Sequence, residues 1–472
     1  MNAFVNAIKA PQEARTENGM KAFDATGSKV LDLFSKIGTA RGRDLTAELA
    51  GSMAEDTDLT ARVLLWARDV REGAGERATV RNLIKQVEKY DVDLARGIMK
   101  RLPELGRWDD LLFSFDKLQE EAFEAYGAAI FAGDALAAKW APREKSTKGR
   151  IAAKLRKVMN LTPREYRQIL AKVSATVEQS MSAKKWDEVN YSHVPSVASM
   201  RYKAAFAKND AVRYNEYLTE LSKPAEDRDP KIKVNAGAIF PHDVVHNARR
   251  GDNRQSDAQW AALPDFVGNA NVLPIVDTSG SMDAPLAGGI NALTVAISLG
   301  LYFAEKNKGP FKDIYLTFSD SSQFNNLKGT LTQKIDQMVT DNKWLGSTNL
   351  HSAFDKILST AIGANAPQSD MPDYLLILSD MEFNWCVRHD DSALQMIKRK
   401  YHEAGYKMPA VIFWNLTARN ESTPVKMGDK GTALVSGFSP AIVKSILTAD
   451  AGEFEPYGMM IKTISSDRYK VA

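Results

Sequence analysis

The stretch that most constrains the fold is residues 271–283, NVLPIVDTSGSMD. Its first half is a continuous apolar run, which predicts a buried strand over residues 272–276. The run gives way to three oxygen-bearing side chains at alternate positions, Asp277, Ser279 and Ser281. Residues 284–305 contain ALTVAISLGLYFA and predict a helix that packs back on the strand. A strand, a polar loop and a helix form the α/β unit whose ligands lie beyond the carboxyl end of the strand.

Two later segments carry the same kind of side chain in the same kind of place. Residues 344–350, WLGSTNL, put Thr348 in a small polar loop, and residues 374–381, YLLILSDM, predict a strand that ends in Asp380. Together with the DxSxS pattern at 277–281, these segments resemble a von Willebrand factor type A (vWA) domain with a metal-ion-dependent adhesion site. The resemblance implies a metal site formed by Asp277, Ser279, Ser281, Thr348 and Asp380.

The donor atoms indicate which metal such a site would take. Hydroxyl and carboxylate oxygens are hard donors that suit Mg²⁺, or another hard cation such as Mn²⁺ or Ca²⁺, whereas zinc would recruit His or Cys. In vWA domains the hydroxyls bind the metal directly, which leaves positive charge for an anionic ligand, either a carboxylate from a protein partner or a phosphate. The alternative interpretation is a plain Asp/Ser turn that caps a helix.

The rest of the C-terminal part alternates strands and helices. Residues 313–318, 374–378 and 410–414 predict buried strands, and residues 331–339 and 392–404 predict helices between them. This alternation is typical of a parallel, doubly wound sheet. We therefore expect residues 266–472 to form a vWA-like, Rossmann-like α/β domain.

The N-terminal part is dominated by a helical period. Between residues 22 and 221 apolar residues recur at three- and four-residue steps, and the connectors are short and carry helix breakers, as in REGAGER at 71–77 and LPELGRW at 102–108. This pattern predicts an irregular, HEAT-like array of antiparallel helix pairs. We expect residues 1–265 to form this all-α domain, so that the 472-residue chain is multidomain.

Helices that precede a DxSxS domain, with REGAGER and GRWDDLL upstream, resemble the TROVE module of the Ro autoantigen and its bacterial and viral relatives. The resemblance covers nearly the whole chain. It implies a ring of helical repeats that binds structured noncoding RNA and the ends of misfolded RNA.

A local excess of positive charge supports an RNA partner independently. Residues 139–172 contain eleven Lys or Arg and two acids, and such a face neutralises phosphates without reading sequence. Residues 181–199 add further basic groups, among them His193, which is either a donor to a base edge or a hydrogen-bonded loop histidine. The candidate RNA-binding residues are Lys139, Arg143, Lys145, Lys148, Arg150, Lys154, Arg156, Lys157, Arg164, Arg167, Lys172, Lys184, Lys185 and His193.

Three aromatic residues lie within or near this basic stretch. Trp140, Tyr166 and Trp186 have rings on which unpaired bases can stack. The alternative for these aromatics is core packing, and the alternative for the charges is a solvated helix face.

Composition and motifs exclude several other classes. The net charge is only +3, and the single cysteine, Cys386, allows no intrachain disulfide, which favours a reducing compartment. The first twenty residues contain no apolar core of a signal peptide, and the longest apolar run is too short to span a membrane, so a cytoplasmic location is expected. Nucleotide-binding, hydrolase and zinc-protease motifs are absent from the sequence, and we expect a binding protein rather than an enzyme. His242 and His246 would need further ligands to hold zinc.

The leading hypothesis is thus an RNA-binding protein with a divalent-metal adhesion site. A second hypothesis is a metal-dependent protein-interaction module whose helices act as a scaffold. A third is a structural part of a larger assembly such as a viral particle.

Overall fold

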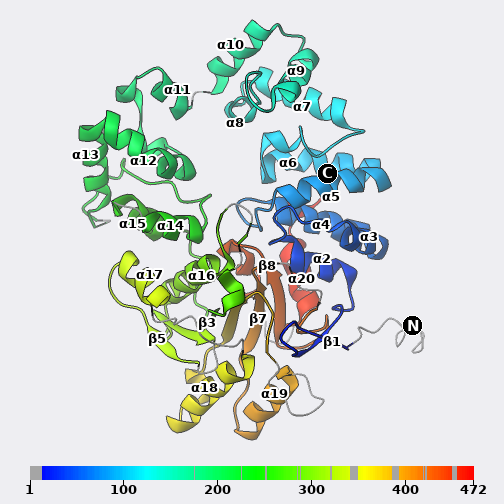
Figure 1. Cartoon of the computed structure of the whole chain (residues 1–472), viewed down its shortest axis with the longest axis vertical. Helices are drawn as coiled ribbons and strands as arrows, with labels where there is room; N and C mark the ends of the chain where they lie inside the picture. The colour runs from blue at the N-terminus through cyan, green and yellow to red at the C-terminus, as the bar shows by residue number, and fades with distance from the viewer. Residues whose placement is uncertain are drawn as a thin grey trace.

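A computed structural model describes most of the chain (Figure 1). The described residues are 13–174, 176–224, 226–249, 252–283, 285–286, 289–318, 322–340, 349–384, 393–417, 419, 422–448 and 454–471. Thr348 and Cys386 lie outside them.

A six-stranded sheet forms the base of the molecule, with the strand order β5-β4-β3-β6-β7-β8. All neighbours are parallel except β5, which pairs antiparallel with β4 at one edge. This order places the first strand, β3, at the centre, as in doubly wound nucleotide-binding folds. The strands are β3 (Val272–Asp277), β4 (Ile314–Phe318), β5 (Phe324–Asn326), β6 (Tyr374–Ser379), β7 (Ala410–Asn415) and β8 (Thr432–Ser436).

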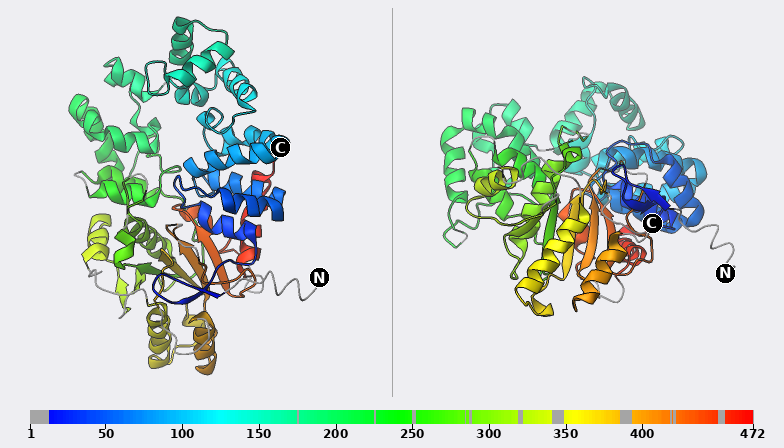
Figure 2. Two further views of the ribbon diagram at one scale, coloured as in Figure 1. Left: turned by 45° about the vertical axis from the view of Figure 1, so that its right-hand side comes forward. Right: turned by 60° about the horizontal axis from the view of Figure 1, so that its bottom comes forward.

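Alternate residues of the central strands enter two different cores. In β3, Val272 and Val276 belong to one hydrophobic cluster, while Leu273 and Ile275 belong to another on the opposite face. Such alternation buries both faces of a parallel sheet. The helices α16 (Ala292–Lys306) and α20 (Pro456–Ile464) cover one face, and α18 (Leu350–Gly363) and α19 (Ala393–Glu403) cover the other, where they project together in Figure 2. The doubly wound α/β prediction is confirmed.

The N-terminal part is a helical array, as predicted. Neighbouring helices pack in succession, beginning with α2 against α3 and α3 against α4. The array consists of α2 (Lys29–Ile37), α3 (Thr46–Glu55), α4 (Thr57–Arg68), α5 (Ala78–Tyr90), α6 (Val92–Leu105), η1 (Trp108–Asp110), α7 (Gln119–Phe131), α8 (Ala135–Trp140), α9 (Gly149–Val158), α10 (Pro163–Ser174), α11 (Val177–Ser182), η2 (Trp186–Glu188), η3 (Tyr191–His193), α12 (Ser196–Asn209), α13 (Ala211–Leu221), α14 (Pro241–Ala248) and α15 (Arg254–Ala261).

These helices form an arch whose two ends both rest on the sheet region (Figures 1 and 2). At the first end α2 packs against β8, and at the second end α14 packs against α16. Helices α2 to α10 share the hydrophobic cluster that also covers one face of the sheet. The α12–α13 side of the arch is built instead around a separate aromatic cluster that contains Tyr191, Phe206, Tyr214 and Tyr217.

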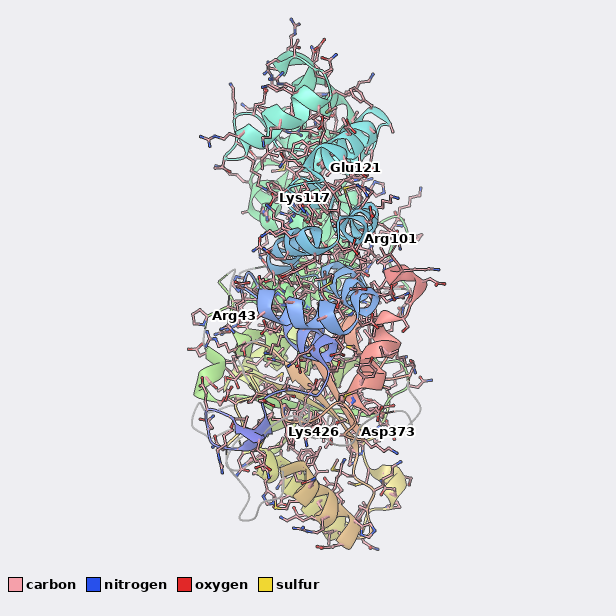
Figure 3. All side chains as sticks on the ribbon, turned by 90° about the vertical axis from the view of Figure 1, so that its right-hand side faces the viewer. Arg43, Arg101, Lys117, Glu121, Asp373 and Lys426 are labelled. Atoms are coloured by element: carbon pink, nitrogen blue, oxygen red, sulfur yellow. The ribbon has the colours of Figure 1, made fainter. Side chains whose placement is uncertain are left out.

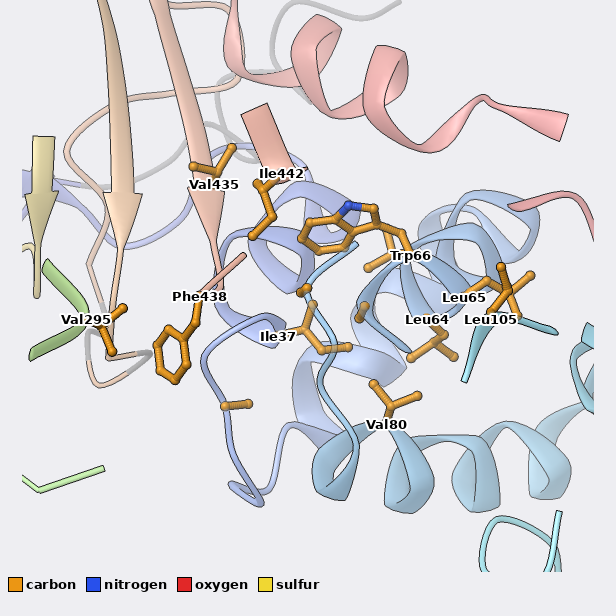
Figure 4. Packing of buried hydrophobic residues seen from close by; sticks show 14 of the residues in the cluster. Ile37, Leu64, Leu65, Trp66, Val80, Leu105, Val295, Val435, Phe438 and Ile442 are labelled. Carbon is orange, nitrogen blue, oxygen red and sulfur yellow. The ribbon is translucent and has the colours of Figure 1, made fainter. Parts of the chain in front are cut away.

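The first end of the arch is joined to the sheet without a break in the core. Figure 4 shows Val435 of β8, Ile37 of α2 and Trp66 of α4 in one continuous cluster. A glycine allows the close approach, because a Cβ at Gly38 would lie 2.2 Å from the carbonyl oxygen of Ser436. The Ser436 hydroxyl accepts a hydrogen bond from the Gly38 N–H at 3.0 Å. The helical array and the sheet are therefore packed together, and the predicted boundary at residues 265/266 stays a prediction.

Several details differ from the predictions. Helix α16 begins at Ala292, where Asn291 caps it, and not at residue 284, because residues 280–283 form a 3-10 turn. The antiparallel edge strand β5 was not predicted, since Phe324–Asn326 has only three residues, two of them asparagine. An N-terminal hairpin of β1 (Glu13–Arg15) and β2 (Lys21–Phe23) was also missed. In the part of the chain that the structure describes, no helix is long and apolar enough to cross a membrane.

Candidate functional site

Asp277 ends the central strand β3, and its carboxylate is fully buried. One oxygen, Oδ1, accepts a hydrogen bond from the Ser279 N–H at 2.9 Å, and the other, Oδ2, accepts one from the Ser379 hydroxyl. The hydroxyl oxygens of Ser279 and Ser281 lie 3.1 Å apart. The DxSxS residues thus converge in one polar loop at the carboxyl end of the sheet, as the strand-and-loop pattern predicted.

Asp380 comes to the same place because β6 is the parallel neighbour of β3. Its side chain is buried, and its Oδ1 accepts a hydrogen bond from the Glu382 N–H at 3.2 Å. Burial, and then the negative charge of Asp380, raise the pKa of Asp277 to about 7. Among the residues that the structure describes, neither carboxylate forms an ion pair with a Lys, Arg or His side chain.

This donor set fits a hard divalent cation. Two buried carboxylates without a cationic side chain are costly, and a metal ion of the Mg²⁺ class would balance their charge. No group of three His, Cys, Asp or Glu suited to a metal occurs among the described residues, and a cation bound here would take hydroxyl oxygens as part of its ligand set. The fifth predicted ligand, Thr348, lies outside the described residues.

Sequence reasoning missed three features that surround this site. The first is Ser379, whose hydroxyl donates to Asp277. Its position directly before Asp380, in the sequence LSD, was the signal that could have identified it. Glu382 is buried, with its pKa raised by burial, and its Oε2 accepts a hydrogen bond from the Glu17 N–H at 2.6 Å. Thr16 donates a hydrogen bond to the carbonyl of Phe383 at 2.6 Å. The N-terminal hairpin therefore packs on the loop that carries Asp380, a long-range contact for which the sequence holds no local signal.

The helical array contains the second candidate site, a groove of about 720 Å³ between the α8–α10 side and the η2–η3 side of the arch. Four of the predicted RNA-binding residues line this groove although they are up to 54 positions apart in the chain: Lys139, Lys172, Lys185 and His193. Glu188 also lines it and pairs with Lys185 at 2.6 Å. The groove will be called the basic groove.

The other ten candidates do not line the basic groove, so the expected set is divided. Arg150, Lys154 and Lys157 lie on the exposed face of α9. Arg156 uses its donors within the protein, because it donates to the Glu144 carboxylate at 2.9 Å and to the Leu161 carbonyl at 2.7 Å. The ten are Arg143, Lys145, Lys148, Arg150, Lys154, Arg156, Lys157, Arg164, Arg167 and Lys184.

The three aromatic candidates differ in how far their rings are exposed to solvent. Tyr166 is buried, and its hydroxyl donates to the Pro142 carbonyl at 3.0 Å, so it cannot stack on a base. Trp186 is half-buried and packs edge-on against Phe206. Trp140 is 36% exposed, and it is therefore the one of the three that presents a ring to solvent.

Comparisons with known proteins identify relatives of the whole chain. The uncharacterized protein L728 of Acanthamoeba polyphaga mimivirus is 30% identical over an alignment of 509 positions that covers 95% of this chain and 86% of the mimivirus protein. The chain belongs to the family of this mimivirus protein. Two domains of unknown function also match: DUF2828 over residues 124–267 and DUF7788 over residues 271–468.

The crystal structure of the Deinococcus radiodurans RO (RSR) protein is a structural neighbour. The two chains are 16% identical, with a TM-score of 0.38 over 92% of this chain and 93% of that one. A TM-score this low does not establish a shared fold, and the Ro resemblance stays a prediction.

Proposed function

We propose that the protein binds RNA through the basic groove. The observation that carries this proposal is the convergence of Lys139, Lys172, Lys185 and His193 on one groove, from α8, α10, the turn before η2, and η3. Cations that gather without a matching number of acids attract phosphates, and their binding releases counterions. The function agrees with the one that the sequence resemblance to the Ro family implies. We assign no catalytic role, and with a single cysteine in the sequence a cytoplasmic location is part of the proposal.

The experiment compares two double variants that remove the same charge. Lys139→Gln/Lys172→Gln alters the basic groove, and Arg150→Gln/Lys157→Gln alters the exposed face of α9. None of these four side chains has an ion-pair partner among the residues of known placement, so both variants should fold. Binding of structured and single-stranded RNA is measured by electrophoretic shift over a salt series.

We expect the groove variant to bind RNA more weakly and with a salt slope lower by roughly 1.4, from about 0.7 for each single-strand phosphate contact. The α9 variant should stay close to the wild type. Equal losses in both variants would contradict the groove and indicate diffuse attraction. Absence of wild-type binding at low salt would defeat the RNA proposal.

We infer in addition that a divalent cation, Mg²⁺ or a hard substitute, is held by Asp277, Ser279, Ser281, Thr348 and Asp380. The buried carboxylate pair without a cationic neighbour supports this proposal. When bound, the cation offers an open coordination position to an anionic oxygen, either a phosphate or a carboxylate of a protein partner. The chain's own residues hold the position: Ser379 orients the Asp277 carboxylate, and the 277–281 loop aims two hydroxyls beside it.

Thermal unfolding with and without Mg²⁺ tests the cation site. The wild-type Tm should rise with Mg²⁺ and fall with chelator, since a ligand that binds only the folded state stabilises it. Asp380→Asn should abolish the response, whereas Asp283→Asn, an exposed acid of the same loop, should keep it. A Tm that ignores Mg²⁺, Mn²⁺ and Ca²⁺ would refute the site.

A further inference from the structure

Arg68 and Arg81, which lie on either side of the REGAGER segment, meet the GRWDDLL segment in a buried ionic network. Asp110 is fully buried and accepts hydrogen bonds from Arg68 Nε at 2.7 Å and Arg81 Nε at 2.6 Å. Its Oδ2 also accepts the backbone N–H of Arg107 at 2.8 Å. A Cβ at Gly106 would lie 2.4 Å from this oxygen, so glycine is required there. The network therefore fixes η1 against α4 and α5.

Asp109 continues this network toward the surface. Arg107 donates to it through Nε at 2.9 Å and Nη2 at 2.8 Å, and Arg81 Nη2 lies 3.1 Å away. Lys148 Nζ lies 4.0 Å from the same carboxylate. The Asp109 side chain is only 3% exposed, while those of Arg107 and Lys148 are 23% and 48% exposed. Asp109 therefore lies beneath the more exposed Arg107 and Lys148, whereas Arg68 is as deeply buried as Asp110.

The charges of this network do not balance. Five cations interact electrostatically with one another or with the two carboxylates, Asp109 and Asp110, so the network has an excess of three positive charges. The five are Arg68, Arg77, Arg81, Arg107 and Lys148. Arg77 is exposed and forms no ion pair with any residue whose placement is described. The N-terminus of α5 adds little further attraction for an anion, because the Glu76 carboxylate already accepts a hydrogen bond from the Thr79 N–H at 3.0 Å.

This cluster connects to the basic groove through one aromatic ring. The guanidinium carbon of Arg107 lies 3.5 Å from the centre of the Trp140 ring. Lys139 Nζ lies 5.7 Å from the same ring centre, and Lys139 also lines the basic groove. Cations and an exposed aromatic ring therefore follow one another from the groove to η1.

Spare donors make the cluster suited to phosphate. Arg107 and Arg81 direct Nε and Nη2 to carboxylates, and within the described part of the chain neither Nη1 has a carboxylate partner. Lys148 Nζ has only a long contact of 4.0 Å to Asp109, and Arg77 has no ion pair with a described residue. Guanidinium groups bind phosphate oxygens in a fixed, multidentate geometry. A single strand places a base beside each phosphate, which suits the neighbouring Trp140.

We propose that this basic cluster binds a backbone phosphate of the RNA strand that occupies the basic groove. Its members are Arg77, Arg81, Arg107 and Lys148. The proposal rests on the RNA-binding function and extends the RNA path from the groove to η1, past Trp140. Asp109 acts as a positioning residue, because it holds Arg107 and Arg81 in place and does not face the ligand.

The test removes two cations that the network does not need for folding. Arg77→Gln/Lys148→Gln is compared with Lys100→Gln/Lys117→Gln, two exposed lysines without ion-pair partners among the described residues; Lys117 is labelled in Figure 3. We expect the cluster variant to bind single-stranded RNA about tenfold more weakly at physiological salt, with a salt slope lower by roughly 1.4. A strand with a neutral methylphosphonate backbone should not distinguish the two variants.

A second probe separates the cluster from RNA binding as a whole. Inorganic pyrophosphate is titrated into the full chain and followed by phosphorus NMR; saturable binding by the wild type and by the lysine control, lost in the cluster variant, supports the site. RNA binding that is equal in the cluster variant and its control overturns the cluster and leaves the groove intact. If the wild type binds no RNA, the proposed function fails, and non-saturable pyrophosphate binding then overturns the cluster as well.

Discussion

His242 should make the stability of the protein fall in mildly acidic solution. It lies on α14, almost fully buried, stacked on Phe240 with ring centres 5.4 Å apart and edge-on to Phe438 at 5.6 Å. Its Nδ1 has no hydrogen-bond partner among the described residues. Burial lowers its pKa from 6.5 to about 4. Of the charged groups around it, Asp243 opposes this shift, while Arg41 and His246 reinforce it.

The sign and size follow from proton linkage. Because the folded pKa lies below the unfolded one, the unfolded chain binds more protons between about pH 6.5 and pH 4, and stability is lost as the pH falls through this window. The loss of stability equals RT times the logarithm of the ratio of the proton-binding polynomials, 1 + 10^(pKa − pH), of the unfolded and folded states. With pKa values of 6.5 and about 4, this loss is about 2 kcal/mol at about pH 5. The full loss, reached below the folded pKa, is roughly 3 kcal/mol.

The test is urea unfolding at about pH 7.5 and about pH 5, followed by the fluorescence of the eight tryptophans. His242→Phe keeps the stacking and removes the titratable group, so its unfolding free energy should fall by about 2 kcal/mol less than that of the wild type. His402→Gln removes an exposed imidazole from α19 and serves as the control. If the wild type and His242→Phe lose equal stability on acidification, the linkage argument is wrong.

Two further substitutions probe packing and charge burial. A Cβ at Gly300 of α16 would lie 2.5 Å from Val276 Cγ2, so Gly300→Ala should lower the free energy of unfolding by about 1–3 kcal/mol. The control is Gly363→Ala in α18, whose Cβ meets no atom within 4 Å, so that this change should be neutral or stabilising. Similar urea midpoints for the two variants would contradict the packing argument. Asp110→Asn leaves Arg68 and Arg81 without their buried carboxylate and should cost about 3–5 kcal/mol in the same assay. Asp116→Asn, at a pair whose acid is 62% exposed, should cost less than about 1 kcal/mol, and equal losses would count against a buried network.

Local pattern was enough to predict much of the sheet and its polar loop. The apolar run before Asp277 and the run before Asp380 each formed a buried strand, because a strand buried on both faces needs continuous apolar sequence. Their adjacency in the sheet then brought the two carboxylates together. What the sequence could not indicate was the N-terminal hairpin beside them, since Thr16 and Phe383 meet across 367 positions.

The helical part was predictable in kind but not in detail. Composition marked residues 139–172 as basic, yet which side chains share a groove depends on how α8 and α10 face η3, a matter of tertiary packing. Tyr166 lies within the basic stretch and is nevertheless buried, because its hydroxyl finds the Pro142 carbonyl. Arg68 of α4 and Asp110 of η1, 42 positions apart in the chain, form a buried hydrogen bond that only tertiary packing brings about.

The arch with both ends on the sheet has a mechanical consequence. Its two sides are built around different hydrophobic clusters, and the basic groove lies at the seam between them, opposite the common base. A molecule bound in this groove would contact both sides of the arch at once, and it would join two parts of the helical array that are built around separate hydrophobic clusters.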